Sequence, residues 1–168
     1  MIDIEFYMKV GDLKKRLSAG EKFSEAQLKS LLESYRSPYP VVYNIETTNA
    51  CNMRCEMCPR TTMMTRPVET MAPELFKRVI DQLSPFSTGQ LARWQDFAEG
   101  YYGVPRNGMS ENHFFLYVIP RVIVLHGYGD PLLDKNIPTY VKWMTERGLE
   151  SYFSCNPANI NMERTIET

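Results

Sequence analysis

The chain has 168 residues, of which 43% are hydrophobic and 23% are charged, and its formal net charge is −1. This length and composition predict one modest globular domain, and the near-neutral charge argues against a nucleic-acid partner. The first residues are acidic without an apolar stretch, and no apolar run is long enough to cross a bilayer. We therefore expect a cytoplasmic protein that has no membrane partner.

Residues 1–40 are predicted to form an N-terminal helical extension. Ser24 followed by Gln27 matches a capping box, in which each residue hydrogen-bonds the backbone of the other. Four apolar or aromatic residues then recur on one helical face: Leu28, Leu31, Leu32 and Tyr35. The sequence "SPYP" at 37–40 ends this helix, because proline removes a donor and restricts the residue before it.

Alternating strands and helices are predicted in the remainder of the chain, 41–168. The predicted strands are 41–47, 121–126 and 149–154. One helix is expected from Pro73 onwards, a second covers about 135–147, and a third begins as the chain ends. This order is typical of an α/β fold with parallel strands and right-handed crossovers.

The segment 84–120 interrupts that order and is too long for an ordinary connection. It is rich in aromatic residues, and we expect a locally packed insertion with its own small apolar cluster. Within it, "QLARWQDFAEGYY" predicts a short helix and "NHFFLYVIP" predicts a strand or a strand-like lead. The alternative is a contact surface for a substrate or partner.

Three of the four cysteines lie in one short stretch directly after the first predicted strand. Cys51, Cys55 and Cys58 have the spacing C-x3-C-x2-C. Cytoplasmic thiols stay reduced, so such clustering indicates a metal site or catalysis rather than disulfides. Three thiolates from one loop would hold three irons of a [4Fe–4S] cluster and leave the fourth iron open to a small molecule.

A zinc site is the alternative for these cysteines, since structural zinc takes four protein ligands. The fourth ligand would then be one of Cys155, His113 or His126. On that hypothesis the chain is a non-enzymatic metal-binding or interaction module.

The stretch "TTNACNMRCEMCPR" resembles the cluster motif of the radical S-adenosylmethionine (radical SAM) superfamily, and specifically its SPASM or twitch branch. The resemblance implies that Cys51, Cys55 and Cys58 bind a [4Fe–4S] cluster. It also implies that S-adenosyl-L-methionine binds the open iron and is reductively cleaved to a 5′-deoxyadenosyl radical, which abstracts hydrogen from a substrate. Met57 stands where family members often have an aromatic residue near the adenine.

Two later segments match the same family in order. "HGYGDPLLD" lies where a Gly-Gly-Glu-type turn meets the amino group of S-adenosylmethionine, which implies roles for Gly127, Gly129 and Asp130. Asp130 replaces the usual glutamate. "SCNPANI" lies where polar residues approach the carboxylate and ribose, which implies roles for Ser154 and Asn156. All three segments follow predicted strands, and ligands of parallel α/β folds collect at those carboxyl ends.

The family domain is a partial (βα)6 TIM-like barrel, and only its first half is recognisable in 41–168. We therefore expect an incomplete core, either a fragment or a chain that needs a second polypeptide to complete the barrel. The implied partners are a peptide or small-molecule substrate and an electron donor such as flavodoxin or ferredoxin. A degenerate remnant of such an enzyme is a further alternative, and no catalytic side chain is singled out.

Overall fold

The computed structural model describes residues 1–38, 41–105 and 113–156. The helix expected at the end of the chain lies outside these ranges. The chain divides into two compact units. Unit 1 joins Met1–Val41 to Phe86–Arg121, and unit 2 joins Val42–Pro85 to Val122–Thr168. The segment predicted as an insertion packs with the N-terminal helices in unit 1, and its apolar cluster also includes Ile4.

Unit 1 is helical. It contains α1 (Ile4–Ser18), α2 (Glu25–Tyr35), α5 (Thr88–Tyr102) and α6 (Phe114–Val118). The predicted capping box at the start of α2 is confirmed: Ser24 Oγ accepts the Gln27 N–H at 3.3 Å, and Gln27 Oε1 accepts the Ser24 N–H at 2.8 Å. The same device, not identified in the sequence, begins α5 at Ser87.

The strand predicted within 112–120 is wrong, because the structure has α6 there. A short apolar run suits a buried strand and a buried helix equally, and its tertiary partners decide between them. Here Leu116 is buried in the core of unit 1, and its carbonyl accepts the indole N–H of Trp94 at 2.7 Å.

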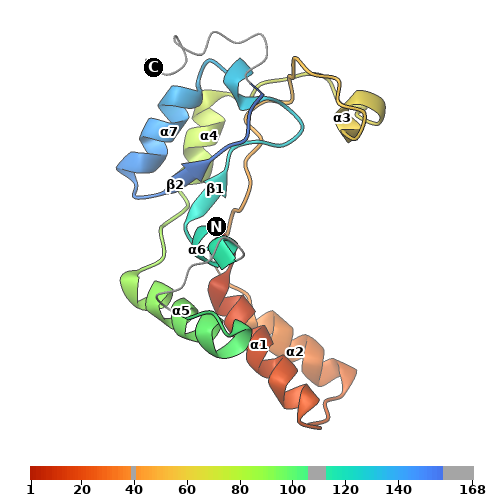
Figure 1. The fold of residues 1–168 in the computed structure, drawn as a ribbon, viewed down its shortest axis with the longest axis vertical. Helices are drawn as coiled ribbons and strands as arrows, with labels where there is room; N and C mark the ends of the chain where they lie inside the picture. Colours follow the sequence, from red (N-terminus) through yellow and green to blue (C-terminus); the bar gives the residue numbers. More distant parts are fainter. Residues whose placement is uncertain (39–40, 106–112, 157–168) are drawn as a thin grey trace. The chain divides into compact units, whose positions relative to one another are not determined.

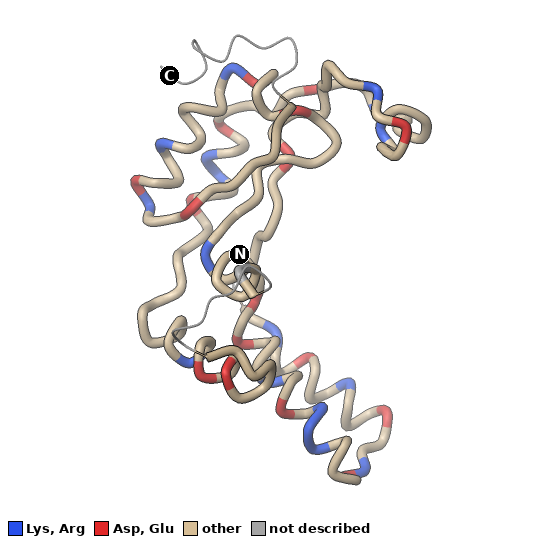
Figure 2. Tube along the Cα trace, viewed as in Figure 1, with Lys and Arg blue, Asp and Glu red and all other residues tan. Residues whose placement is uncertain are grey.

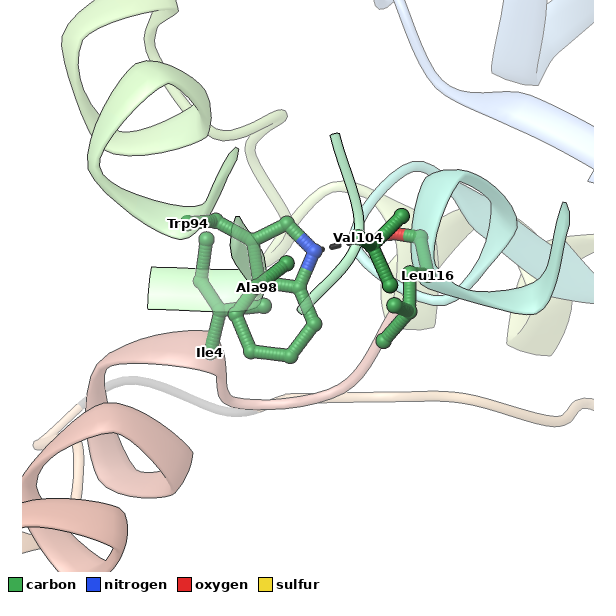
Figure 3. Close-up of a cluster of buried hydrophobic side chains, with 5 residues drawn as sticks. All are labelled: Ile4, Trp94, Ala98, Val104 and Leu116. Atoms are coloured by element: carbon green, nitrogen blue, oxygen red, sulfur yellow. Dashed lines mark hydrogen bonds between the residues drawn. The ribbon is translucent and has the colours of Figure 1, made fainter. Parts of the chain in front are cut away.

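That core is drawn in Figure 3. It gathers residues from three helices and the segment after α5, namely Ile4, Trp94, Ala98, Val104 and Leu116. Trp94 is 1% exposed and lies at its centre. At the rim of unit 1, Arg93 forms an ion pair with Glu5 of α1.

Unit 2 contains a parallel pair of strands, β1 (Val122–Val124) and β2 (Glu150–Tyr152), with Ile123 opposite Ser151. Its helices are α3 (Pro59–Thr62), α4 (Pro73–Ile80) and α7 (Ile137–Glu146), with a 3-10 turn, η2, at Pro131–Leu133. Figure 1 shows α4 and α7 beside the two strands. The described part of unit 2 is therefore of the α/β class, and the half-barrel stays a prediction.

The first predicted strand, 41–47, is reduced to a single parallel bridge between Asn44 and Val124. Two backbone hydrogen bonds of 2.8 Å support it, from Ile45 N–H to Val124 O and from Val124 N–H to Tyr43 O. Beyond residue 45 the segment stops pairing with β1, because the carbonyl of Thr47 accepts the N–H of Met71 instead. The residues that follow the cysteine loop, around Met71, thus pair with Thr47 where a longer strand would have paired with β1.

The helices of unit 2 pack through a stacked pair of rings. Phe76 of α4 and Tyr140 of α7 lie with centroids 4.0 Å apart and planes 13° apart. Both residues are fully buried. The Tyr140 hydroxyl donates to Met71 O at 2.9 Å, and burial raises the pKa of Tyr140 to about 12. The tyrosine therefore connects α7 to the segment that precedes α4.

Charged residues of both signs are interspersed along the described helices rather than separated by sign (Figure 2). None of the described helices combines the length and the apolarity that crossing a membrane requires.

Candidate functional site

Three segments of unit 2 meet where β1, β2 and the bridged segment reach their carboxyl ends. Ser154 N–H donates to His126 Nδ1 at 3.0 Å, and Asn156 N–H donates to Asp130 Oδ2 at 3.2 Å. Asp130 N–H in turn donates to Ala50 O at 2.7 Å. The structure therefore brings together the three segments that the sequence predicted to share one edge.

The glycines of "GYGDP" allow the turn after β1 to approach the segment before the cysteines. A Cβ at Gly129 would lie 2.0 Å from the carbonyl oxygen of Thr48, and one at Gly127 would lie 2.5 Å from Glu46 Oε1. Neither distance is possible for a real Cβ. At Gly129 the obstacle is backbone, so the close contact of the two segments requires glycine there, whereas at Gly127 it is the side chain of Glu46, which would have to move. This contact holds the turn beside the cysteine loop.

Asp130 is 3% exposed, and both of its carboxylate oxygens accept backbone hydrogen bonds. Oδ1 accepts the Leu132 N–H at 3.0 Å, and Oδ2 accepts the Asn156 N–H. The side chain thus fixes the turn after β1 to the segment after β2. Each oxygen retains a second lone pair, and the expected contact with an ammonium group stays a prediction.

Glu46 is a carboxylate of this site that the sequence analysis did not identify. Its Oε1 accepts the Tyr128 N–H at 2.6 Å, and its Oε2 forms an ion pair with Arg66. The Arg66 guanidinium lies 5.5 Å from the ring centroid of Tyr128. The available signal was an acidic residue at the end of a predicted strand, directly before the cysteine motif.

The cysteine loop leaves the strands and carries α3 towards its far end (Figure 1). Cys51 and Cys58 are half-buried and Cys55 is exposed. Cys58 N–H donates to Cys55 O at 3.1 Å, and Met53 N–H donates to Cys51 Sγ at 3.4 Å. Met57, expected near an adenine, is 86% exposed.

No group of three or more His, Cys, Asp or Glu residues in the described ranges is arranged to hold a metal ion. The three thiols are therefore close in sequence but not gathered around one point. Their chemistry still fits an iron–sulfur cluster, because three thiolates on one loop are the soft ligands that such clusters take.

The three residues considered as a fourth zinc ligand lie in different surroundings. His126 Nδ1 accepts the Ser154 N–H, and burial lowers the pKa of this imidazole, so the neutral ring is favoured. Cys155 is exposed in the segment after β2. His113 lies in unit 1, whereas His126 and all four cysteines lie in unit 2.

The chain was compared with protein families, curated proteins and solved structures. No protein-family model matches the chain, and no curated protein matches its sequence. Among solved structures, the chain is similar to BtrN in complex with AdoMet and 2-DOIA, with 18% sequence identity and a TM-score of 0.45. The match covers 75% of this chain and 40% of that one.

Proposed function

We propose that this chain is a radical SAM enzyme, or the catalytic N-terminal portion of one. In this proposal Cys51, Cys55 and Cys58 hold a [4Fe–4S] cluster. When bound, such a cluster supplies one electron to S-adenosylmethionine, which breaks into methionine and a 5′-deoxyadenosyl radical that takes a hydrogen atom from a peptide or small-molecule substrate.

The observation that carries the proposal is the meeting of three segments at one edge of unit 2. The turn with Gly127 and Gly129 contacts the segment that leads into the cysteine motif, and the segment after β2 is hydrogen-bonded to the same turn. These are the segments that the family motif pairs with the cluster and with S-adenosylmethionine. Their sequence order alone did not require that they lie together.

The chain's own residues have distinct tasks in this proposal. Asp130 keeps the turn and the segment after β2 in register through its two backbone hydrogen bonds. Ser154 and Asn156 would then present polar groups to the carboxylate and ribose. Met57, which is exposed, would pack against the adenine, as a flexible thioether side chain can.

An external electron donor such as flavodoxin or ferredoxin belongs to the same proposal. So does a second polypeptide that completes the barrel.

The test is anaerobic reconstitution of the chain with iron and sulfide, followed by dithionite reduction in the presence of S-adenosylmethionine. We expect bound iron and sulfide and the release of 5′-deoxyadenosine. The triple variant Cys51→Ala, Cys55→Ala, Cys58→Ala is expected to lose both. Cys155→Ala is the matched control, since it removes an exposed thiol outside the motif, and it is expected to retain the cluster.

A native chain that takes up no iron and sulfide would contradict the cofactor assignment, and zinc bound in their place would favour the metal-module alternative. A cluster that persists in the triple variant would contradict the ligand assignment. A cluster that forms without 5′-deoxyadenosine would indicate a remnant or a chain that needs its second polypeptide.

A further inference from the structure

The base of the cysteine loop is closed by polar contacts that do not involve the cysteines. Asn49 lies two residues before Cys51 and is 4% exposed. Its Nδ2 donates to Pro67 O at 2.8 Å, and its Oδ1 accepts the Glu69 N–H at 2.7 Å. The backbone N–H of Asn49 also donates to Glu69 O at 3.2 Å. One buried amide thus joins the start of the loop to its return.

Thr48 reinforces this closure beside Asn49. Its Oγ1 lies 3.1 Å from Glu69 O and 3.0 Å from Thr70 Oγ1, and Thr48 and Thr70 form an antiparallel bridge. The same hydroxyl accepts the Ala50 N–H at 3.1 Å. Buried polar groups that are fully hydrogen-bonded in this way rigidify the backbone that carries them.

A second, inner closure spans the cysteines themselves. Arg60 Nε donates to the carbonyl oxygen of Asn49 at 2.8 Å. The chain between these two residues contains all three motif thiols, so the contact closes a short ring around 51–58. Arg60 is half-buried, whereas Arg54, which lies inside the ring, is exposed.

We infer that Asn49 and Arg60 are positioning residues that hold the two ends of 51–58 so that the three thiols can converge on a metal. The inference rests on the proposed function for its ligands. The thiols are not gathered in the structure, and metal binding commonly completes the ordering of its own loop. Fixing both ends beforehand reduces the conformational entropy that this ordering costs.

The test is Co²⁺ binding to the full chain under anaerobic conditions, measured through thiolate-to-cobalt charge-transfer absorption. Removing residues that orient metal ligands commonly weakens metal affinity by about 10- to 100-fold. We therefore expect Arg60→Ala to weaken Co²⁺ binding about tenfold or more. Arg54→Ala removes the same charge from the same loop without opening the ring, and it is expected to bind within about twofold of the native chain.

Asn49→Ala removes the side-chain hydrogen bonds to Pro67 and Glu69 but keeps the backbone carbonyl that accepts from Arg60, and it is expected to weaken Co²⁺ binding about tenfold. If this buried substitution prevents folding, the inference is tested by the Co²⁺ affinities of Arg60→Ala and Arg54→Ala alone, because neither arginine belongs to the core. The melting temperature of the metal-free Arg60→Ala chain is expected to match the native value, which separates positioning from a general loss of stability.

Equal weakening by Arg60→Ala and Arg54→Ala would overturn the inference in favour of simple charge balance. Native affinity in Arg60→Ala, or a native chain without thiolate–cobalt absorption, would overturn it outright. The proposed function fails separately: a chain with the expected Co²⁺ contrast that assembles no iron–sulfur cluster would retain the positioning role and lose the enzymatic one.

Discussion

Gly129 is the residue where the turn after β1 comes closest to the segment before the cysteine loop. A Cβ there would meet the backbone carbonyls of Thr48 at 2.0 Å and Ala50 at 2.7 Å, and neither can move independently of the loop base. We expect Gly129→Ala to push the two segments apart, to break the Asp130–Ala50 hydrogen bond, and to lower the free energy of unfolding by about 2 to 3 kcal/mol. Guanidinium denaturation followed by circular dichroism measures this loss.

Gly100→Ala is the matched control for that substitution. Gly100 lies inside α5 without a positive φ, and no atom lies within 4 Å of the position that a Cβ would take. Replacing a helical glycine by alanine stabilises a helix by roughly 0.5 to 1 kcal/mol. A Gly129→Ala chain as stable as the native one would show that the turn and the loop base do not contact each other as described.

Individual residues were predictable where their chemistry is local. The turn glycines and the polar residues after β2 were singled out through the family resemblance together with their position after predicted strands, and their binding roles stay predictions. The partners of Asp130 could not, because its carboxylate bonds a residue 26 positions later. Asn49 was missed for the same reason: its partners Pro67 and Glu69 lie across a loop whose closure no local pattern encodes.

At the scale of elements, the contact of α7 with the segment before α4 depends on one hydroxyl group. Tyr140→Phe keeps the ring stacked on Phe76 but leaves Met71 O without its donor. We expect a loss of about 1 to 2 kcal/mol in unfolding free energy, because a partly buried carbonyl would be left without its donor. Because the pKa of Tyr140 is raised to about 12, the hydroxyl stays protonated and the loss should be the same at pH 6 and pH 9.

The comparison variant is Tyr43→Phe, which removes a hydroxyl from a side chain that is 46% exposed. Surface substitutions of this kind usually change stability by less than about 0.5 kcal/mol. If urea unfolding gave the same midpoint for Tyr140→Phe as for Tyr43→Phe, the hydrogen bond to Met71 would not contribute to stability.

Elements with their own end signals were predicted correctly, and so were the strands β1 and β2, whereas the predicted strands at 41–47 and within 112–120 were not. The capping box of α2 is contained in four residues, so the sequence suffices to locate it. The segment 41–47 has the composition of a strand, but only its middle residues find a pairing partner in β1. The apolar run that forms α6 has no comparable local signal. Its helical structure depends on tertiary contacts, such as the hydrogen bond from the Trp94 indole to the carbonyl of Leu116.

At the scale of the whole molecule, the chain passes three times between two compact units, each with its own buried residues. Composition and length are compatible with one modest domain, and neither reports how segments that lie far apart in the sequence combine into units. The pairing of 86–121 with the N-terminal helices depends on contacts such as those between Ile4 and Trp94. These contacts join two segments that the sequence analysis predicted separately, the extension at 1–40 and the insertion at 84–120.

Because each unit has its own core, a destabilising substitution in one unit is expected to increase local opening mainly in that unit. Ile4 and Met144 are both fully buried, one in α1 of unit 1 and the other in α7 of unit 2. Ile4→Ala and Met144→Ala each remove a large core side chain, which costs about 2 to 5 kcal/mol. Hydrogen exchange measured by mass spectrometry should then accelerate mainly in peptides of α5 for Ile4→Ala and mainly in peptides of α4 for Met144→Ala. Equal acceleration of both peptides by either substitution would mean that the two units unfold as one, since cooperative units exchange together.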